Sequence, residues 1–209
     1  HVRYVVVFQN WLKPAGASID HLHKQVVAID EVGADNESVL PKAVLDPGIF
    51  NRWGPDFAVE HGLVLACNEG AVMTVGFGHR YPSVEVWSTS RVDQPWRVDD
   101  EGIDAVSDLL HAAHVAVSDD VPANEEWHYR PMGTGVTVPW RIILKLRIST
   151  LAGFEGGTKI YANTISPAAL AAMLLPKLFQ ARAAGRIAPM DLGDECEIPR
   201  GALAATWVR

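Results

Sequence analysis

The pattern His21-Leu-His23-Lys-Gln25 is the part of this 209-residue sequence whose residue types and spacing best fit chemistry. We expect residues 20–29 to form a strand, in which alternate side chains share one face, so that His21, His23 and Gln25 project together. A neutral imidazole is a competent nucleophile at neutral pH. The Ser18 hydroxyl and nearby backbone N–H groups can hold phosphate oxygens, and Gln25 can donate to another. The pattern therefore fits attack by an imidazole on a phosphate group.

Two other interpretations of the same histidines stay open. The chain has eight histidines, so a chance His-x-His pair is not rare, and a solvent-facing strand is a common setting for one. His-x-His on a strand also supplies two metal ligands on one face, and a third ligand would then have to come from elsewhere. The histidine pair alone does not decide among these interpretations.

The elements around this pattern are predicted from apolar spacing and turn residues. Residues 3–9 are β-branched and aromatic and predict a strand, which a turn over residues 11–16 connects to the strand 20–29 as a hairpin. Residues 31–55 are rich in Gly, Pro, Asn and Asp and predict a long connection, with a domain boundary near residue 50. Further strands are predicted over residues 57–67, 71–77, 83–90, 127–132, 140–148 and 159–163.

Two segments have the apolar spacing of helices. Over residues 99–118, apolar residues recur on one helical face, and an aspartate can cap the start. Ser166 and Pro167 open a second helix that Gly185 ends, and Pro176 should kink it. Strands in adjacent groups, with two helices between and after them, predict an α+β fold of antiparallel sheets with helices on one face.

The composition limits the class of protein. A hydrophobic fraction of 48% and a charged fraction of 21% are typical of a soluble globular chain and exclude a disordered, coiled-coil or collagen-like one. The net charge of −7 argues against a nucleic-acid partner. No apolar run approaches the ~18 residues of a membrane span, and no leader is visible, so we expect a cytoplasmic location without membrane contact. Cys67 and Cys196 form no Cys-x-x-Cys pair, which excludes a cysteine-based zinc site within this chain.

Several other polar residues allow two interpretations each. Lys145 and Arg147 share a predicted strand face and can bind phosphate or pair with acidic residues. His111 and His114 can form a metal pair on the predicted helix, although a solvated helix face explains them as well. Residues 153–158 predict a glycine-bearing loop that lacks the lysine of a phosphate-binding P-loop.

The residues before and within the histidine pattern resemble a known active site. Asn10, then Gly16-Ala17-Ser18, then His21-x-His23-x-Gln25 resemble the active-site strand pair of the histidine triad superfamily, in particular its galactose-1-phosphate uridylyltransferase-like branch. The second domain of such proteins is similar to residues 80–85, 140–147, 152–158, 160–163 and Pro167. The resemblance covers most of residues 5–175.

The resemblance implies a nucleotidyltransferase or phosphorylase that acts at the α-phosphate of a nucleotide sugar or dinucleotide. His23 would be the nucleophile and form a nucleotidyl-histidine, and the main chain of His21 would orient its ring. The implied substrate-binding residues are Asn10, Gly16, Ser18, Gln25, Phe154, Gly157 and Thr158. The last three are expected to reach the pocket of a partner subunit, because members of this branch are homodimers.

The resemblance also implies what this chain lacks. Family members carry an upstream Cys-x-x-Cys that often binds zinc together with the first histidine, so His21 can be a structural zinc ligand only if residues outside this chain supply the others. No other cofactor is expected. A second family metal site uses histidines on the strand where this chain has Arg141, which predicts that this site is lost. Leu22 stands where the uridylyltransferases have proline, which favours a relative of those enzymes.

The same resemblance divides the chain into three parts. Residues 1–45 would be the C-terminal hairpin of a truncated catalytic domain, residues 46–186 a second histidine-triad-like domain, and residues 187–209 an irregular tail. We expect the hairpin to pair with a sheet formed by an N-terminal segment outside this sequence. His21, His23 and Gln25 should line a common hollow beside the bend at Ser18.

Three functions are compatible with these expectations. The first is nucleotidyl transfer or phosphorolysis through His23. The second is a histidine-triad hydrolase of nucleotide conjugates, which differs in using water as the acceptor. The third is a catalytically idle domain that binds nucleotides or a partner.

Overall fold

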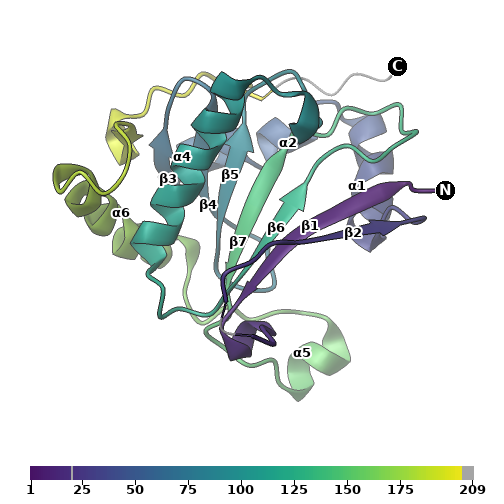
Figure 1. Ribbon diagram of the computed structural model, residues 1–209, viewed down its shortest axis with the longest axis horizontal. Helices are drawn as coiled ribbons and strands as arrows, with labels where there is room; N and C mark the ends of the chain where they lie inside the picture. The colour runs from purple at the N-terminus through teal and green to yellow at the C-terminus, as the bar shows by residue number, and fades with distance from the viewer. Residues whose placement is uncertain (20, 204–209) are drawn as a thin grey trace.

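The computed structural model describes residues 1–19 and 21–203 and is built around one antiparallel sheet (Figure 1). Its strands are β1 (Tyr4–Trp11), β2 (Gln25–Ile29), β3 (Val64–Cys67), β4 (Ala71–Gly76), β5 (Ser83–Ser88), β6 (Ala123–His128), β7 (Arg141–Leu146) and β8 (Asp191–Leu192). Within the described residues they form an eight-stranded sheet in the order β2-β1-β6-β7-β5-β4-β3-β8. Every neighbouring pair is antiparallel. The predicted α+β class with an antiparallel sheet is confirmed.

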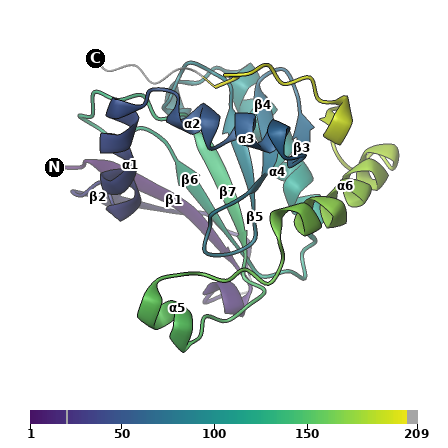
Figure 2. The same ribbon diagram turned by 180° about the vertical axis from the view of Figure 1, so that it is seen from behind.

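Helices cover both faces of this sheet (Figures 1 and 2). The α-helices are α1 (Ala34–Leu45), α2 (Ile49–Arg52), α3 (Pro55–Glu60), α4 (Asp100–Val117), α5 (Gly153–Thr158) and α6 (Pro167–Ala183). The long helices α4 and α6 pack against each other and against β3 and β4, as the prediction of helices on one face requires. The short helices α1 to α3 lie on the opposite side of the sheet from α4, which the sequence analysis did not predict.

The two long helices begin where their sequence signals predict. The Asp99 carboxylate accepts from the backbone N–H of Gly102 at 3.0 Å, and the Ser166 hydroxyl accepts from that of Ala169 at 3.2 Å. Each cap satisfies one of the backbone donors that the first turn of a helix leaves unpaired. Pro176 lies inside α6 without ending it, so the helix continues to Ala183.

Alternation along the strands gives the sheet two different faces. On the α4 face, Val86, Ile142 and Leu144 pack into the main hydrophobic core with Leu109 of α4. Their strand neighbours point the other way, onto a face that we call the polar face because it carries the side chains of Asn10, Glu85, Asn124, Glu126, Lys145 and Arg147. One end of the polar face is closed by a second apolar cluster, in which Trp87 packs against Ala43 and Phe50.

Several predicted elements differ from the observed ones. Residues 31–55, predicted as a connection, contain α1 and α2, because contacts with Trp87 on the polar face stabilise short helices that have little apolar spacing of their own. The predicted strand 57–67 is α3 followed by β3, and the predicted strand 127–132 is displaced to β6. Residues 153–158 form α5 instead of a loop, and residues 159–163 form no strand.

The hairpin at the start of the chain is part of the main sheet. β1 pairs with β2 on one side and with β6 on the other, so the prediction that both hairpin strands pair outside this sequence is wrong for β1. Within the described residues, β2 is an edge strand. The division of the chain at residue 45 stays a prediction, because two domains can share one sheet.

The end of the chain is less irregular than predicted. In the predicted tail 187–209, β8 pairs with β3 and is followed by a 3-10 helix over Gly193–Glu195. Residues 204–209 of this tail, and Asp20 of the predicted strand 20–29, lie outside the described residues. None of the described helices is long and apolar enough to cross a membrane.

Candidate functional site

The histidine pattern lies in the segment that leads into β2. Residues 21–24 have no regular strand structure, and the strand begins at Gln25, which pairs with Phe8 of β1. The turn before this segment needs a left-handed residue, and Gly16 supplies it with φ +87° while its N–H donates to the carbonyl of Lys13 at 2.9 Å. The predicted strand therefore begins five residues later than expected.

Two side chains of this segment, those of Leu22 and Lys24, face α4. Lys24 forms an ion pair with Glu125 of β6, which packs against α4 through His114. Leu22 and Lys24 both line a cavity of about 690 Å³ between the α4 face and α4. Gln25 pairs with Phe8 and therefore shares the polar face with it, and strict alternation through Lys24 would bring His23 to the same side.

The ring of His23 is held by the backbone of His21. His23 Nδ1 lies 2.6 Å from the carbonyl oxygen of His21. A carbonyl can only accept, so Nδ1 carries the proton of the neutral ring, and Nε2 keeps its lone pair. His23 is half-buried and His21 is exposed, with 6.5 Å between the two ring centres. The resemblance implies a contact of this kind between the main chain of His21 and the ring of His23, whereas the nucleophilic role of Nε2 stays a prediction.

The other predicted site residues of this segment differ in how exposed their side chains are. Asn10 and Gln25 are half-buried, whereas Gly16 and Ser18 are exposed. We expected His21, His23 and Gln25 to line a common hollow. None of these three residues lines any of five cavities in the described part of the chain. Asn10 does line a cavity, on the polar face.

The predicted residues on α5 lie at the same end of the molecule as the histidine segment. Figures 1 and 2 both place α5 below the sheet, beside the turn that precedes the histidine segment. Phe154 is 58% exposed, and Gly157 and Thr158 are exposed too. The helix is closed by its own side chains, because Glu155 accepts from the N–H of Ala152 at 3.0 Å and Thr158 donates to the carbonyl of Phe154 at 2.6 Å. Its outer surface is free to meet another molecule.

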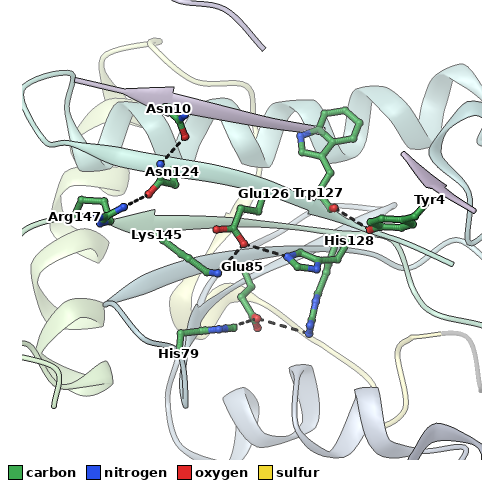
Figure 3. Close-up of polar contacts among 11 residues, drawn as sticks. Tyr4, Asn10, His79, Glu85, Asn124, Glu126, Trp127, His128, Lys145 and Arg147 are labelled. Carbon is green, nitrogen blue, oxygen red and sulfur yellow. Dashed lines mark hydrogen bonds and ion pairs between the residues drawn. The ribbon is translucent and has the colours of Figure 1, made fainter. Parts of the chain in front are cut away.

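A row of polar side chains continues from Asn10 across the polar face (Figure 3). Asn10 pairs with Asn124 of β6, Asn124 pairs with Lys145 of β7, and Lys145 pairs with Ser83 of β5. Extending the register of β1 and β2 by two residues places His23 next to Asn10 at the other end of this row. The polar row from Asn10 to Lys145 thus points toward the end of the sheet at which the histidine segment enters β2.

The charges on this surface are paired. Glu126 lies 2.7 Å from the Lys145 ammonium and 3.5 Å from His128. Burial would raise the pKa of Glu126, but donation from His128 and the charge of Lys145 outweigh it and hold the pKa at about 2. Burial likewise opposes ionisation of Glu85, yet the hydrogen bond from His79 at 2.7 Å leaves its pKa lowered. Lys145 therefore pairs with an acidic residue, which was one of its two predicted roles.

A cavity of about 620 Å³ opens above the polar row. Its polar wall is formed by Asn10, Asn124, Glu126, His128 and Arg147, and its other wall includes Phe8, Ile29 and Val32. Asn124, Glu126 and His128 were not predicted as site residues. Their alternation along residues 123–128 was the available signal, but the predicted strand was displaced from this segment. The cavity can hold a group that is part polar and part apolar.

The described residues contain no group of three or more His, Cys, Asp or Glu side chains that could hold a metal ion. His114, one member of the predicted helix pair, instead lies 3.0 Å from the Glu125 carboxylate. His21 is exposed and can be one ligand of an ion whose other ligands come from elsewhere. Residues 1–19 and 21–203 do not by themselves supply a zinc site.

The fold and the histidine hairpin define the class of protein. An ADP-glucose phosphorylase from Arabidopsis thaliana, solved with bound ADP-glucose, matches with a TM-score of 0.73 and 23% identity over 83% of this chain and 58% of its own. A GalT-like protein from Arabidopsis thaliana matches with a TM-score of 0.71 and 22% identity over 83% of this chain and 60% of its own. A uridylyltransferase matches with a TM-score of 0.70 and 18% identity over 86% of this chain and 62% of its own. The chain therefore has a fold similar to that of these three proteins.

The family is shown by the sequence itself. Residues 1–205 match a family described as a domain of unknown function (DUF4921), and the chain belongs to that family. No curated protein matches it. The chain spans about 60% of the length of the solved proteins that it resembles.

Proposed function

We propose that this protein transfers a nucleotidyl group from the α-phosphate of a nucleotide sugar or dinucleotide, with His23 as the nucleophile. The observation that carries the proposal is the 2.6 Å contact between His23 Nδ1 and the carbonyl of His21. It supports a single tautomer whose Nε2 lone pair is ready to attack. The three solved proteins of this fold, named as a phosphorylase, a GalT-like protein and a uridylyltransferase, support the same class of reaction.

The reaction would proceed by two displacements at the α-phosphorus. Nε2 of His23 attacks, an N–P bond forms, and the P–O bond to the leaving phosphate breaks, so that a sugar phosphate or a nucleotide departs. An oxygen of a phosphate or sugar phosphate then attacks the same phosphorus, and the N–P bond breaks to return the electron pair to Nε2. Atoms and charges balance without any further reactant.

The neighbouring donors would stabilise the charge that develops on the phosphate oxygens. Asn10 and Gln25 are half-buried on the same side as His23, and the backbone N–H groups near Gly16 and the Ser18 hydroxyl lie on the turn beside it. Preorganised donors of this kind contribute strongly, since removing one costs about 100- to 1000-fold in rate in known acyl-transfer sites.

The remaining parts of the site are proposed from the exposed residues. Phe154, Gly157 and Thr158 would contact the substrate in the site of a second copy of the chain, which makes the active form a homodimer. His21 would bind structural zinc if residues outside this chain complete the site, and no chemical step uses that ion. A cytoplasmic location remains a prediction.

The test is a search for the covalent intermediate. The protein is incubated with ADP-glucose, UDP-glucose or a diadenosine polyphosphate, and its intact mass is measured. We expect a nucleotidyl adduct that is absent from His23→Ala. His61→Ala is the matched control, because His61 is exposed and its Nδ1 lies 3.0 Å from the carbonyl of Phe57, the same kind of contact on α3.

The fate of the adduct separates the alternatives. Loss of the adduct only after addition of phosphate or a sugar phosphate supports a transferase or phosphorylase. Rapid loss in buffer alone supports the hydrolase. No adduct with any of these nucleotides overturns the proposal and favours an idle binding domain.

A further inference from the structure

The carboxamide of Asn124 is fixed in one orientation by two neighbours of opposite character. Its Oδ1 lies 2.8 Å from Nη1 of Arg147, which can only donate. Its Nδ2 lies 2.7 Å from the backbone carbonyl of Ala15, which can only accept. Turning the carboxamide over would place an oxygen against the Ala15 carbonyl and an amine against the guanidinium. Asn124 therefore has a single favourable orientation.

This orientation decides that of Asn10. The second hydrogen of Asn124 Nδ2 is donated to Oδ1 of Asn10 at 2.7 Å (Figure 3). Since the Asn10 oxygen is engaged, its Nδ2 is the atom left for other partners, and it has no acceptor among the described residues. Asn10 lines the cavity on the polar face. The register of β1 and β2, extended two positions beyond Phe8 and Gln25, would place Asn10 opposite His23. An amide N–H group at this position can donate a hydrogen bond to an anionic oxygen.

The same side chain also ties the turn to the sheet. Ala15 is buried and immediately precedes Gly16, so the contact from Asn124 fixes the start of the turn that carries Ser18. Arg147 is itself anchored, because its guanidinium lies 4.5 Å from the ring centre of the buried Tyr81. The chain of contacts runs from a buried aromatic ring to two groups beside His23.

We propose that Asn124, held by Arg147, is a positioning residue that makes Asn10 present its amide N–H group, and not its carbonyl oxygen, to a phosphate oxygen of the substrate at His23. The proposal rests on the proposed function of His23. Neither Asn124 nor Arg147 needs to touch the substrate for this role. Because the Asn10 donor would act on charge that develops during attack, the effect should fall on the rate of attack more than on binding.

The test uses single-turnover formation of the His23 adduct with whichever of ADP-glucose or UDP-glucose labels the wild type. Asn124→Asp keeps the shape and the contact with Arg147 but can no longer donate to Asn10, so Asn10 must turn over. Asn124→Leu removes the same donor without adding charge. For both variants we expect the maximal rate to fall about 10- to 100-fold and the half-saturating concentration to change less than about 3-fold.

Asn68→Asp is the matched control. Asn68 is also half-buried, and its Nδ2 donates to the carbonyl of Ala105 at 2.8 Å, but it lies between β3 and β4, away from His23. Its adduct rate should equal that of the wild type. If Asn124→Asp does not fold, Arg147→Lys is the second variant, since a lysine keeps the charge but not the fork that orients Asn124. Its maximal rate should also fall.

The outcomes separate the two proposals. An adduct that forms at the wild-type rate in the Asn124 variants, or a loss that falls only on the half-saturating concentration, overturns the positioning role and leaves the function of His23 standing. Absence of an adduct in the wild type overturns the proposed function and this inference with it. A slower maximal rate in the Asn124 variants, with Asn68→Asp unchanged, supports both.

Discussion

Lys24 and Glu125 form an ion pair across 101 positions of sequence, on the face of the sheet that α4 covers. The Glu125 side chain is completely buried, and it also accepts from Trp127 Nε1 at 2.6 Å and His114 Nε2 at 3.0 Å. Lys24 is the residue after His23 and is not part of a regular strand. The ion pair is therefore the contact that attaches the histidine segment to β6.

Lys24→Met should loosen this attachment. The lysine is 41% exposed, so solvent screening reduces the stability loss to about 1 kcal/mol, which urea unfolding would measure. Because the neighbouring His23 loses its anchor, the rate of adduct formation should also fall, measured under conditions in which the variant is fully folded. Lys42→Met on α1 is the control, since Lys42 is exposed and contacts only Ser38 four residues away among the described residues. An unchanged adduct rate in Lys24→Met would contradict the anchoring role.

Stability should fall steeply in acid because of Glu125. Burial would raise the pKa of Glu125, but the hydrogen bond from His114 and the charge of Lys24 hold the pKa at about 2, against an ordinary value of 4.5. A carboxyl with a lowered folded pKa stabilises the fold fully above the unfolded value and loses this contribution as the pH falls through the folded one. We expect a loss on the order of 3 kcal/mol between pH 4.5 and 2.

Urea unfolding at a series of pH values measures this loss. Glu125→Gln cannot titrate, so its free energy of unfolding should depend less on pH over this window, although it is lower at neutral pH. Equal slopes for wild type and variant would show that other carboxyl groups carry the acid sensitivity.

His23→Ala should abolish adduct formation with little effect on stability. The ring is half-buried at the edge of the sheet and leaves no core cavity when removed, so we expect a change within about 0.5 kcal/mol. Gln25→Ala should slow the reaction by about 100- to 1000-fold, the scale of one lost donor to a charged oxygen. Intact mass and thermal unfolding of the same samples check both. A large stability loss in His23→Ala would indicate a structural histidine.

The cap of α4 gives a prediction that is independent of function. Asp99→Ala removes the acceptor for the N–H of Gly102 and should cost about 1 kcal/mol of unfolding free energy. Asp104→Ala, an exposed position inside the same helix, is the control. Similar stability of the two variants would contradict the capping role.

The two long helices and most strands could be predicted because their signals are local. Ser166 with Pro167 marks the start of α6, and strand-type residues between turn signals mark β4 and β5. The short helices α1 and α2 could not be predicted in this way, because they are stabilised by Trp87 from another part of the chain. The helix α5 was missed because its glycines favour a loop.

The site could be predicted only in part for the same reason. His21, His23 and Gln25 are close in sequence, so their pattern and its resemblance to a known active site could be seen without a structure. Asn124 and Arg147 lie more than 100 positions from Asn10 in the sequence. Only the pairing of β1 with β6 brings Asn124 to Asn10, so nothing in the local sequence distinguishes it.

By itself, the sequence predicted the α+β class and the histidine hairpin, because the apolar spacing and the turn residues that mark each element are local. The tertiary structure decided that this hairpin joins the main sheet, that Lys24 is anchored to Glu125 of β6, and that a carboxamide from β6 orients Asn10. These relationships depend on strand pairing between distant segments, which backbone hydrogen bonds and burial select and local residue patterns do not specify.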